Sequence, residues 1–152
     1  MREIKAPNKF TSYNDEFSVF LAGSIEMGTA ELWQDKMVDA LSDLTGIILN
    51  PRRDDWDATW VQDITNDAFR EQVEWELHGL ETVDLAMFCF DPNTKSPITL
   101  LELGLFHKKA LVCCPIGFWR KGNVDIVCRH YGVPQVETIN DLIKELRHRR
   151  GN

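Results

Sequence analysis

The feature that most constrains this chain is a series of mainly apolar runs. The three longest span residues 18–22, 83–90 and 110–114, and shorter candidates span 46–49 and 132–136. Strands that are covered on both faces read as continuous hydrophobic runs, because neither face alternates with water. The three longest runs therefore predict buried parallel strands, residues 46–49 a shorter strand, and residues 132–136 a fifth strand at a sheet edge, where its proline is tolerated.

Stretches with helical spacing separate these runs. Apolar residues that recur every three to four positions lie on one face of a helix. The stripes are Trp33, Met37, Ala40, Leu41 and Leu44, with Thr29 as N-cap; Phe69, Val73, Leu77 and Leu80; and Leu142, Ile143 and Leu146. The alternation predicts a three-layer α/β domain, flavodoxin-like or Rossmann-like, with a five-stranded, mainly parallel sheet in the order 2-1-3-4-5. We expect one domain over residues 1–152, with residues 1–16 as a flexible N-terminal arm.

The charge of the chain limits its partners. A formal net charge of −7 argues against polymeric nucleic acid, which needs a basic face on the protein. No stretch approaches the ~20 apolar residues of a membrane span, and residues 1–16 lack the apolar core of a secretion signal. We therefore expect a cytoplasmic protein whose partners are small molecules, with no membrane association.

The four cysteines do not suggest a metal centre. Cys89, Cys113, Cys114 and Cys128 lack the paired spacing of zinc ligands, and three of them sit in or beside apolar runs. Buried, reduced thiols are the expected state. We expect neither a metal nor a cofactor.

Glu102 is the main candidate for chemistry. It is a lone carboxylate within residues 98–106, a predicted helix that is apolar on nearly every side and is therefore expected to be buried. A buried carboxylate without a partner is costly and usually marks a functional site. We interpret Glu102 as a catalytic nucleophile. The alternative is an acid in the first helical turn that faces water and complements the helix dipole.

Glu76 is a second candidate. It lies seven residues after Phe69 and four before Leu80, which places it on the apolar face of the second predicted helix. Two nearby carboxylates in different environments can divide the nucleophilic and proton-transfer roles between them. Alternatively, Glu76 lies at the edge of the stripe with its carboxylate in water.

Three loops are expected at the carboxyl edge of the sheet, where open α/β folds bind ligands. In the first, Gly23 and Ser24 could let the backbone approach a ligand, although a tight turn without a ligand would look similar. In the second, Arg52 or Arg53 could bind a phosphate and Trp56 could stack on a base, or nearby aspartates could neutralise the arginines. In the third, Asp91 could contact a ligand or simply open a turn before proline.

Three short segments together resemble the nucleoside 2-deoxyribosyltransferases. They are Phe-Leu-Ala-Gly-Ser at 20–24, Trp-Glu-Leu at 75–77 and Leu-Glu-Leu-Gly at 101–104. The resemblance is closest to a branch of short, transferase-like proteins with a Trp-Glu pair, and it covers about residues 19–114. It implies that Glu102 attacks C1′ of a deoxyribonucleoside and that Glu76 assists it. It also implies substrate contacts from Gly23, Ser24 and Asp91, and, from a neighbouring subunit, Asn123.

The resemblance implies a homo-oligomer that transfers deoxyribose between bases. Cleavage of an N-glycosidic bond passes through an oxocarbenium-like state that a carboxylate can trap covalently, as in retaining glycosidases. A closing loop that carries Trp56 or Trp60 could exclude water and so favour transfer. Two alternatives stay open: an N-glycosidase that hydrolyses a nucleoside or its 5′-monophosphate, and a nucleotide-binding module without turnover.

Overall fold

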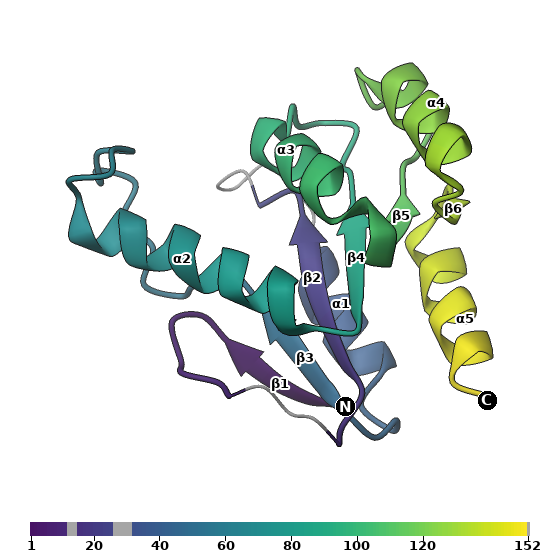
Figure 1. The fold of residues 1–152 in the computed structure, drawn as a ribbon, viewed down its shortest axis with the longest axis horizontal. Coiled ribbons are helices and arrows are strands. Elements are labelled where there is room, and N and C mark those ends of the chain that lie inside the picture. Colours follow the sequence, from purple (N-terminus) through teal and green to yellow (C-terminus); the bar gives the residue numbers. More distant parts are fainter. Residues whose placement is uncertain (12–14, 26–31, 152) are drawn as a thin grey trace.

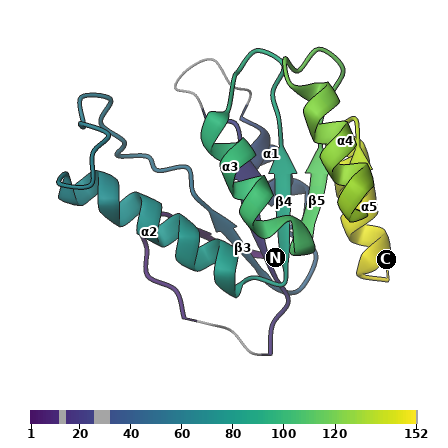
Figure 2. The same cartoon turned by 45° about the horizontal axis from the view of Figure 1, so that its top comes forward.

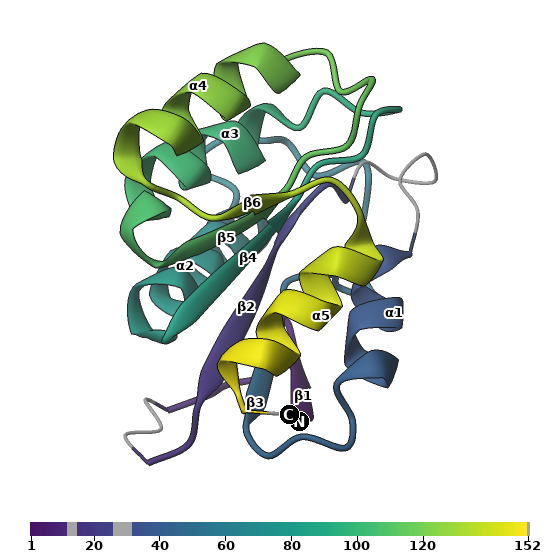
Figure 3. The same ribbon diagram turned by 90° about the vertical axis from the view of Figure 1, so that its right-hand side faces the viewer.

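The computed structural model describes residues 1–11, 15–25 and 32–151. Six parallel strands form one sheet (Figure 1), and helices cover both of its faces (Figure 3). The strands are β1 (Arg2–Lys5), β2 (Ser18–Gly23), β3 (Ile47–Asn50), β4 (Leu85–Cys89), β5 (Ala110–Cys113) and β6 (Gln135–Val136). The helices are α1 (Trp33–Ala40), α2 (Asp67–Thr82), α3 (Pro97–Phe106), α4 (Lys121–Tyr131) and α5 (Ile139–Arg149), with a 3-10 turn, η1 (His107–Lys109), after α3.

The strand order is β1-β3-β2-β4-β5-β6. Without β1, this is the predicted order 2-1-3-4-5, which confirms the flavodoxin-like arrangement. The expected number of five strands was too low, because β1 comes from the segment that we expected to be a flexible arm. Its sequence, Arg-Glu-Ile-Lys, contains a single buried residue, so no apolar run announces it. Strand β1 pairs with β3 (Arg2 beside Ile47, Lys5 beside Asn50) and is the first in the strand order, so it forms one edge of the sheet.

Two apolar clusters fill the layers on either side of the sheet. Helices α2, α3 and α4 cover one face, and α1 and α5 cover the other (Figure 3). The predicted stripes of the first and last helices are confirmed: Trp33 and Met37 are buried on α1, and Leu142 and Leu146 on α5. The proposed N-cap Thr29 lies outside the described residues.

The buried face of α2 differs from the predicted one. Its apolar stripe was expected to run through Val73 and Leu77, but these side chains are 36% and 37% exposed. The helix instead buries Gln72, Trp75, Gly79 and Leu80. A Cβ at Gly79 would lie 2.6 Å from the Phe20 ring, so the helix packs on the sheet through its glycine. This rotation brings Gln72 and Glu76 to the inner side.

We had expected helix α3 to be buried on every side, but one side of it is exposed. It lies between α2 and α4 (Figure 2), and its outer residues Ile98, Leu101 and Leu105 are each 60% exposed. Its inner side packs on the sheet through Leu103.

The structure also shows the state of the cysteines and the apolar length of the helices. All four cysteines are free and buried, as the sequence predicts. Within the described ranges, no helix is long and apolar enough to cross a membrane.

Candidate active site

Glu102 points inward from α3. The helix starts with Pro97 at its first turn, after Ser96, whose φ of 47° is in the left-handed region that few non-glycine residues adopt. Five residues on, the Glu102 side chain is turned to the interior, with 8% of the residue exposed. The alternative of a solvent-facing acid in the first turn is therefore wrong.

Glu76 comes from the neighbouring helix α2. Asn66 caps this helix, because its side chain accepts a hydrogen bond from the Phe69 amide. The preceding residue, Trp75, packs in the core and donates its indole N–H to the Asn8 carbonyl at 2.9 Å. Trp75 therefore has a structural role in the core, whereas Glu76 faces the carboxyl edge of the sheet.

The carboxyl groups of Glu76 and Glu102 both have raised pKa values. Burial, together with the smaller effect of the nearby Glu76 charge, raises the pKa of Glu102 to about 8. Burial also raises the pKa of Glu76, to about 7, against a smaller lowering by a hydrogen bond from Gln72. Like charges so close cannot both ionise easily, and such pairs titrate in two coupled steps. Near neutral pH, the pair therefore holds about one proton.

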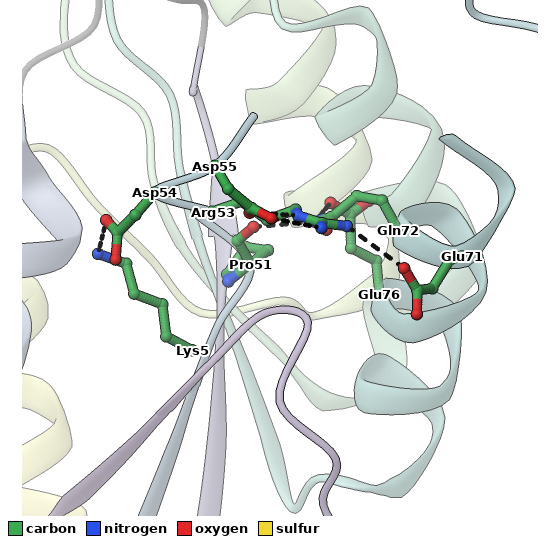
Figure 4. A network of polar contacts seen from close by, with 8 residues as sticks. All are labelled: Lys5, Pro51, Arg53, Asp54, Asp55, Glu71, Gln72 and Glu76. Carbon is green, nitrogen blue, oxygen red and sulfur yellow. Dashed lines mark hydrogen bonds and ion pairs between the residues drawn. The ribbon is translucent and has the colours of Figure 1, made fainter. Parts of the chain in front are cut away.

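Gln72 connects Glu76 to the loop after β3 (Figure 4). Its side-chain Nε2 donates to Glu76 Oε1 at 2.7 Å and to the Pro51 carbonyl at 2.8 Å. Apolar spacing did not predict a role for Gln72, because the predicted stripe placed it off the buried face.

A buried cluster of three hydroxyl groups lies beside the start of α3. Ser24 Oγ lies 2.5 Å from Ser96 Oγ and accepts a hydrogen bond from Thr94 Oγ1 at 2.8 Å. It also accepts from the Asp91 amide at 3.0 Å. The cluster ties the end of β2 to the loop that precedes Glu102. Ser24 was predicted, whereas Thr94 and Ser96 were not; their only sequence signal is the polar loop 91–96.

Gly23 and Asp91 have local structural roles. A Cβ at Gly23 would lie 2.4 Å from the Cys89 carbonyl oxygen and 2.7 Å from the Trp33 ring, so packing alone requires glycine there. Asp91 Oδ1 accepts from the Asn93 backbone N–H at 2.8 Å, which is the turn-opening arrangement. Both residues nevertheless lie at the carboxyl edge, one residue from the hydroxyl cluster or bonded to it.

The arginines of the second loop are engaged. Arg53 is almost fully buried and pairs with Asp55 Oδ1 through Nε at 2.9 Å and with Glu71 through Nη1 at 3.6 Å. Arg52 Nη1 lies 3.4 Å from Gln34 Oε1. Arg53 therefore fits the alternative in which nearby acidic residues neutralise the arginines. Arg52 is the less constrained of the two.

The aromatic candidates and Asn123 lie farther out. Trp56 packs edge-on against Trp60, with ring centroids 4.9 Å apart, and the Arg53 guanidinium lies 5.1 Å from the Trp60 ring. Asn123 is exposed in the first turn of α4. In the part of the chain that the structure describes, no hydrogen bond joins Asn123 to Glu76 or Glu102.

Two surface cavities lie at the opposite, amino edge of the sheet. One of about 590 Å³ is lined by Lys108, Lys109 and Arg149, among others, and one of about 680 Å³ by residues around Met1 and Gly46. Lys109 Nζ donates to the carbonyls of Glu81 and Val83. Its charge thus stabilises the end of α2, as is usual for cations at a helix C-terminus.

Comparison with known proteins shows the family of the chain. The family model described as nucleoside 2-deoxyribosyltransferase like matches residues 16–118, from the start of β2 to the loop after β5. The chain belongs to this family. The nucleoside 2-deoxyribosyltransferase-like region therefore contains both carboxylates and the whole hydroxyl cluster, and membership favours glycosyl-transfer chemistry on small nucleoside-type substrates. No curated protein matches the chain.

Proposed function

We propose that this protein cleaves the N-glycosidic bond of deoxyribonucleosides and transfers the deoxyribosyl group to another base. The observation that carries the proposal is the pair of acids with raised pKa values, the buried Glu102 and the half-buried Glu76, in a chain of this family. Perturbed acids at the carboxyl edge of a parallel sheet are typical of catalytic sites.

In the proposed reaction, ionised Glu102 attacks C1′ while the bond from C1′ to the base nitrogen breaks. Glu76 gives its proton to the departing base, and a glycosyl ester of Glu102 remains. A nitrogen of the incoming base then attacks C1′, the ester bond breaks, and Glu102 is released as a carboxylate while Glu76 takes up the proton. Atoms and charges balance over the two steps.

Substrate contacts are proposed from the loops that surround the pair. Ser24 and Gly23 lie where the sugar would enter, beside the hydroxyl cluster, and Asp91 follows β4. Arg52 and Trp56 belong to the loop after β3, which Gln72 joins to Glu76. No metal or cofactor is needed for this chemistry.

A hydrolase is the closest alternative. It would release the base from a nucleoside or its 5′-monophosphate by letting water attack the glycosyl-enzyme. Phosphate binding by Arg52 or Arg53 would favour it; Arg53 is already paired with Asp55 and Glu71, whereas Arg52 is less constrained. The pairing of Arg53 leaves Arg52 as the candidate phosphate ligand of that alternative.

Product analysis tests the proposal. Incubation of a deoxynucleoside with a second free base, followed by chromatography, should give a new deoxynucleoside. Free deoxyribose in place of the new nucleoside would indicate the hydrolase. Binding without any base release, unaltered in Glu102→Gln, would indicate a non-catalytic nucleotide-binding module.

We also propose that the protein is a homo-oligomer. Helices that are apolar all round are normally buried, yet Ile98, Leu101 and Leu105 on α3 are exposed in the single chain. Ile126 and Tyr131 on the neighbouring α4 are exposed as well. A second copy covering this face would also bring a partner's Asn123 closer to the carboxylate pair, as the family resemblance implies.

A further inference from the structure

Gln72 is a buried amide with an unusual set of partners. It lies on α2, one turn before Glu76, and only 4% of the residue is exposed. Both hydrogens of Nε2 are used, one on Glu76 Oε1 and the other on the Pro51 carbonyl. The Oε1 atom is buried and accepts no hydrogen bond within the described residues. The side chain is therefore held entirely by its two donated bonds.

The orientation of this amide is fixed by its neighbours. The Pro51 carbonyl can only accept a hydrogen bond, so the atom beside it must be the amide nitrogen. The same nitrogen then faces the Glu76 carboxyl with its second hydrogen. A donated hydrogen bond favours the ionised form of a carboxyl group.

Glu102 has no matching donor. Over the described ranges, no hydrogen bond reaches its carboxyl group, whereas Glu76 receives a short one of 2.7 Å. The pair is therefore asymmetric. We propose that Gln72 is a positioning residue that keeps the negative charge of the pair on Glu76, leaves the shared proton on Glu102, and couples this arrangement to the loop after β3.

The other charged groups nearby do not reverse this preference. Glu102 faces Glu76 from α3, and repulsion between the two charges opposes ionisation of either group once the other is ionised, so it does not choose between them. Arg53 approaches from the loop, but its guanidinium is paired with Asp55 and Glu71 (Figure 4). Glu71, on the same helix, is held at the solvent side by that pair. Gln72 is the one described polar group that distinguishes the two acids by a direct bond.

The placement of the shared proton on Glu102 also affects the reaction, an inference that rests on the proposed function. The free protein would hold the nucleophile Glu102 protonated and its assistant Glu76 ionised. The proton must therefore pass from Glu102 to Glu76 before attack, and then to the departing base. Because Gln72 also bonds Pro51, a movement of the loop on substrate binding would weaken its hold on Glu76 and favour this transfer.

Carbon-13 NMR of glutamate side-chain carboxyls tests the assignment without requiring activity. Glu76→Gln and Glu102→Gln each remove one signal and so identify the pair. In the native protein, the Glu76 signal should titrate first as the pH rises. In Gln72→Leu, we expect its titration midpoint to rise by about one to two pH units. Glu102 should then lose its proton first.

Two further variants make the outcome decisive. Gln72→Met keeps the side-chain length without the donor, and it should give the same shift if Gln72→Leu does not fold. Gln34→Leu removes another fully buried glutamine, which contacts neither acid, and should leave both titrations in place. An unchanged Glu76 midpoint without the Gln72 donor, or an equal shift in Gln34→Leu, overturns the assignment. A native titration order without any nucleoside product would instead reject only the proposed function.

Discussion

At the scale of single residues, the arrangement depends on where one carboxylate can lose its proton. Burial raises the pKa of Glu102 from an ordinary value of 4.5 to about 8, and that of Glu76 to about 7. Both acids are thus largely uncharged in mildly acidic solution. The proposed reaction needs one ionised and one protonated member, so it needs the pair in its singly protonated state.

The pH dependence of kcat/KM follows from this state. We expect a bell-shaped profile with limbs near pH 7 and pH 8, because kcat/KM reports the titration of the free enzyme. The two limbs belong to the pair and not to single residues. Initial rates of base release between pH 5 and pH 10 measure the profile, and a flat response across pH 6–9 would contradict a catalytic pair.

Removal of either acid should abolish or slow the reaction. Glu102→Gln is expected to lower base release by about 10⁴-fold or more, as for the loss of a nucleophile. Glu76→Gln should cost about 10²–10⁴-fold while substrate still binds. Glu74→Gln is the matched control, since Glu74 is an exposed glutamate on the same helix. Normal turnover in Glu76→Gln would make Glu76 a bystander.

Glu102 should also make the free energy of unfolding decrease as the pH rises. Between about pH 4.5 and 8, the folded protein binds more protons at Glu102 than the unfolded chain, so the free energy of unfolding decreases as pH rises. Glu102→Gln cannot ionise and escapes this decrease. At pH 9, we expect its Tm to exceed that of the native protein by at least about 3 °C, and the difference to vanish at pH 4. Calorimetry at both pH values measures it, and a lower Tm at pH 9 would show that the carboxylate is stabilising.

At the scale of elements, close contacts decide how the strands and helices meet. Gly23 ends β2 between the Cys89 carbonyl and the Trp33 ring, and Gly79 lets α2 approach Phe20. Both glycines bring functional elements together: the first carries Ser24, and the second turns Glu76 inward. Close packing of this kind tolerates little added volume.

Gly23→Ala should therefore destabilise the protein. The added methyl group would lie 2.4 Å from a backbone oxygen of the paired strand, which must shift. We expect a loss of about 1–3 kcal/mol in the free energy of unfolding by urea titration. Gly122→Ala is the control, because a Cβ there meets nothing within 4 Å, and it should be neutral or slightly stabilising. Equal stability of the two variants would show that the β2–β4 contact is loose.

At the scale of the whole molecule, the outer faces of α3 and α4 remain uncovered. Apolar side chains of this size rarely stay exposed together on a monomer, and larger exposed patches usually mark interaction sites. The chain has a net charge of −7. The exposed face of α3 nevertheless has no acidic side chain, because the only acid of this helix, Glu102, is buried.

A double variant, Leu101→Glu with Leu105→Glu, should convert the proposed oligomer to a monomer. Charged side chains in an apolar interface would be desolvated without partners. Light scattering coupled to gel filtration measures the mass. Ile64→Glu is the control, since Ile64 is also exposed but lies in the loop before α2. A monomeric native protein at high concentration, or a double variant of unchanged mass, would contradict the proposal.

Local patterns in the sequence determined much of this structure. Continuous apolar runs predicted the buried strands β2, β4 and β5, and their alternation with helices predicted the strand order. Spacing predicted the buried stripes of α1 and α5, and Glu102 stood out because it interrupts an apolar helix. The family resemblance over residues 19–114 was confirmed by the match to residues 16–118.

Only the tertiary structure decided the rest. The short polar strand β1 exists because β3 offers it an open edge, which no local pattern records. The inner face of α2 was set by the contact of Gly79 with Phe20, so apolar spacing alone chose the wrong side and missed Gln72. The bond from Gln72 to Glu76 and the hydroxyl cluster join residues of different elements, and their geometry arises only when long-range packing fixes each backbone in place.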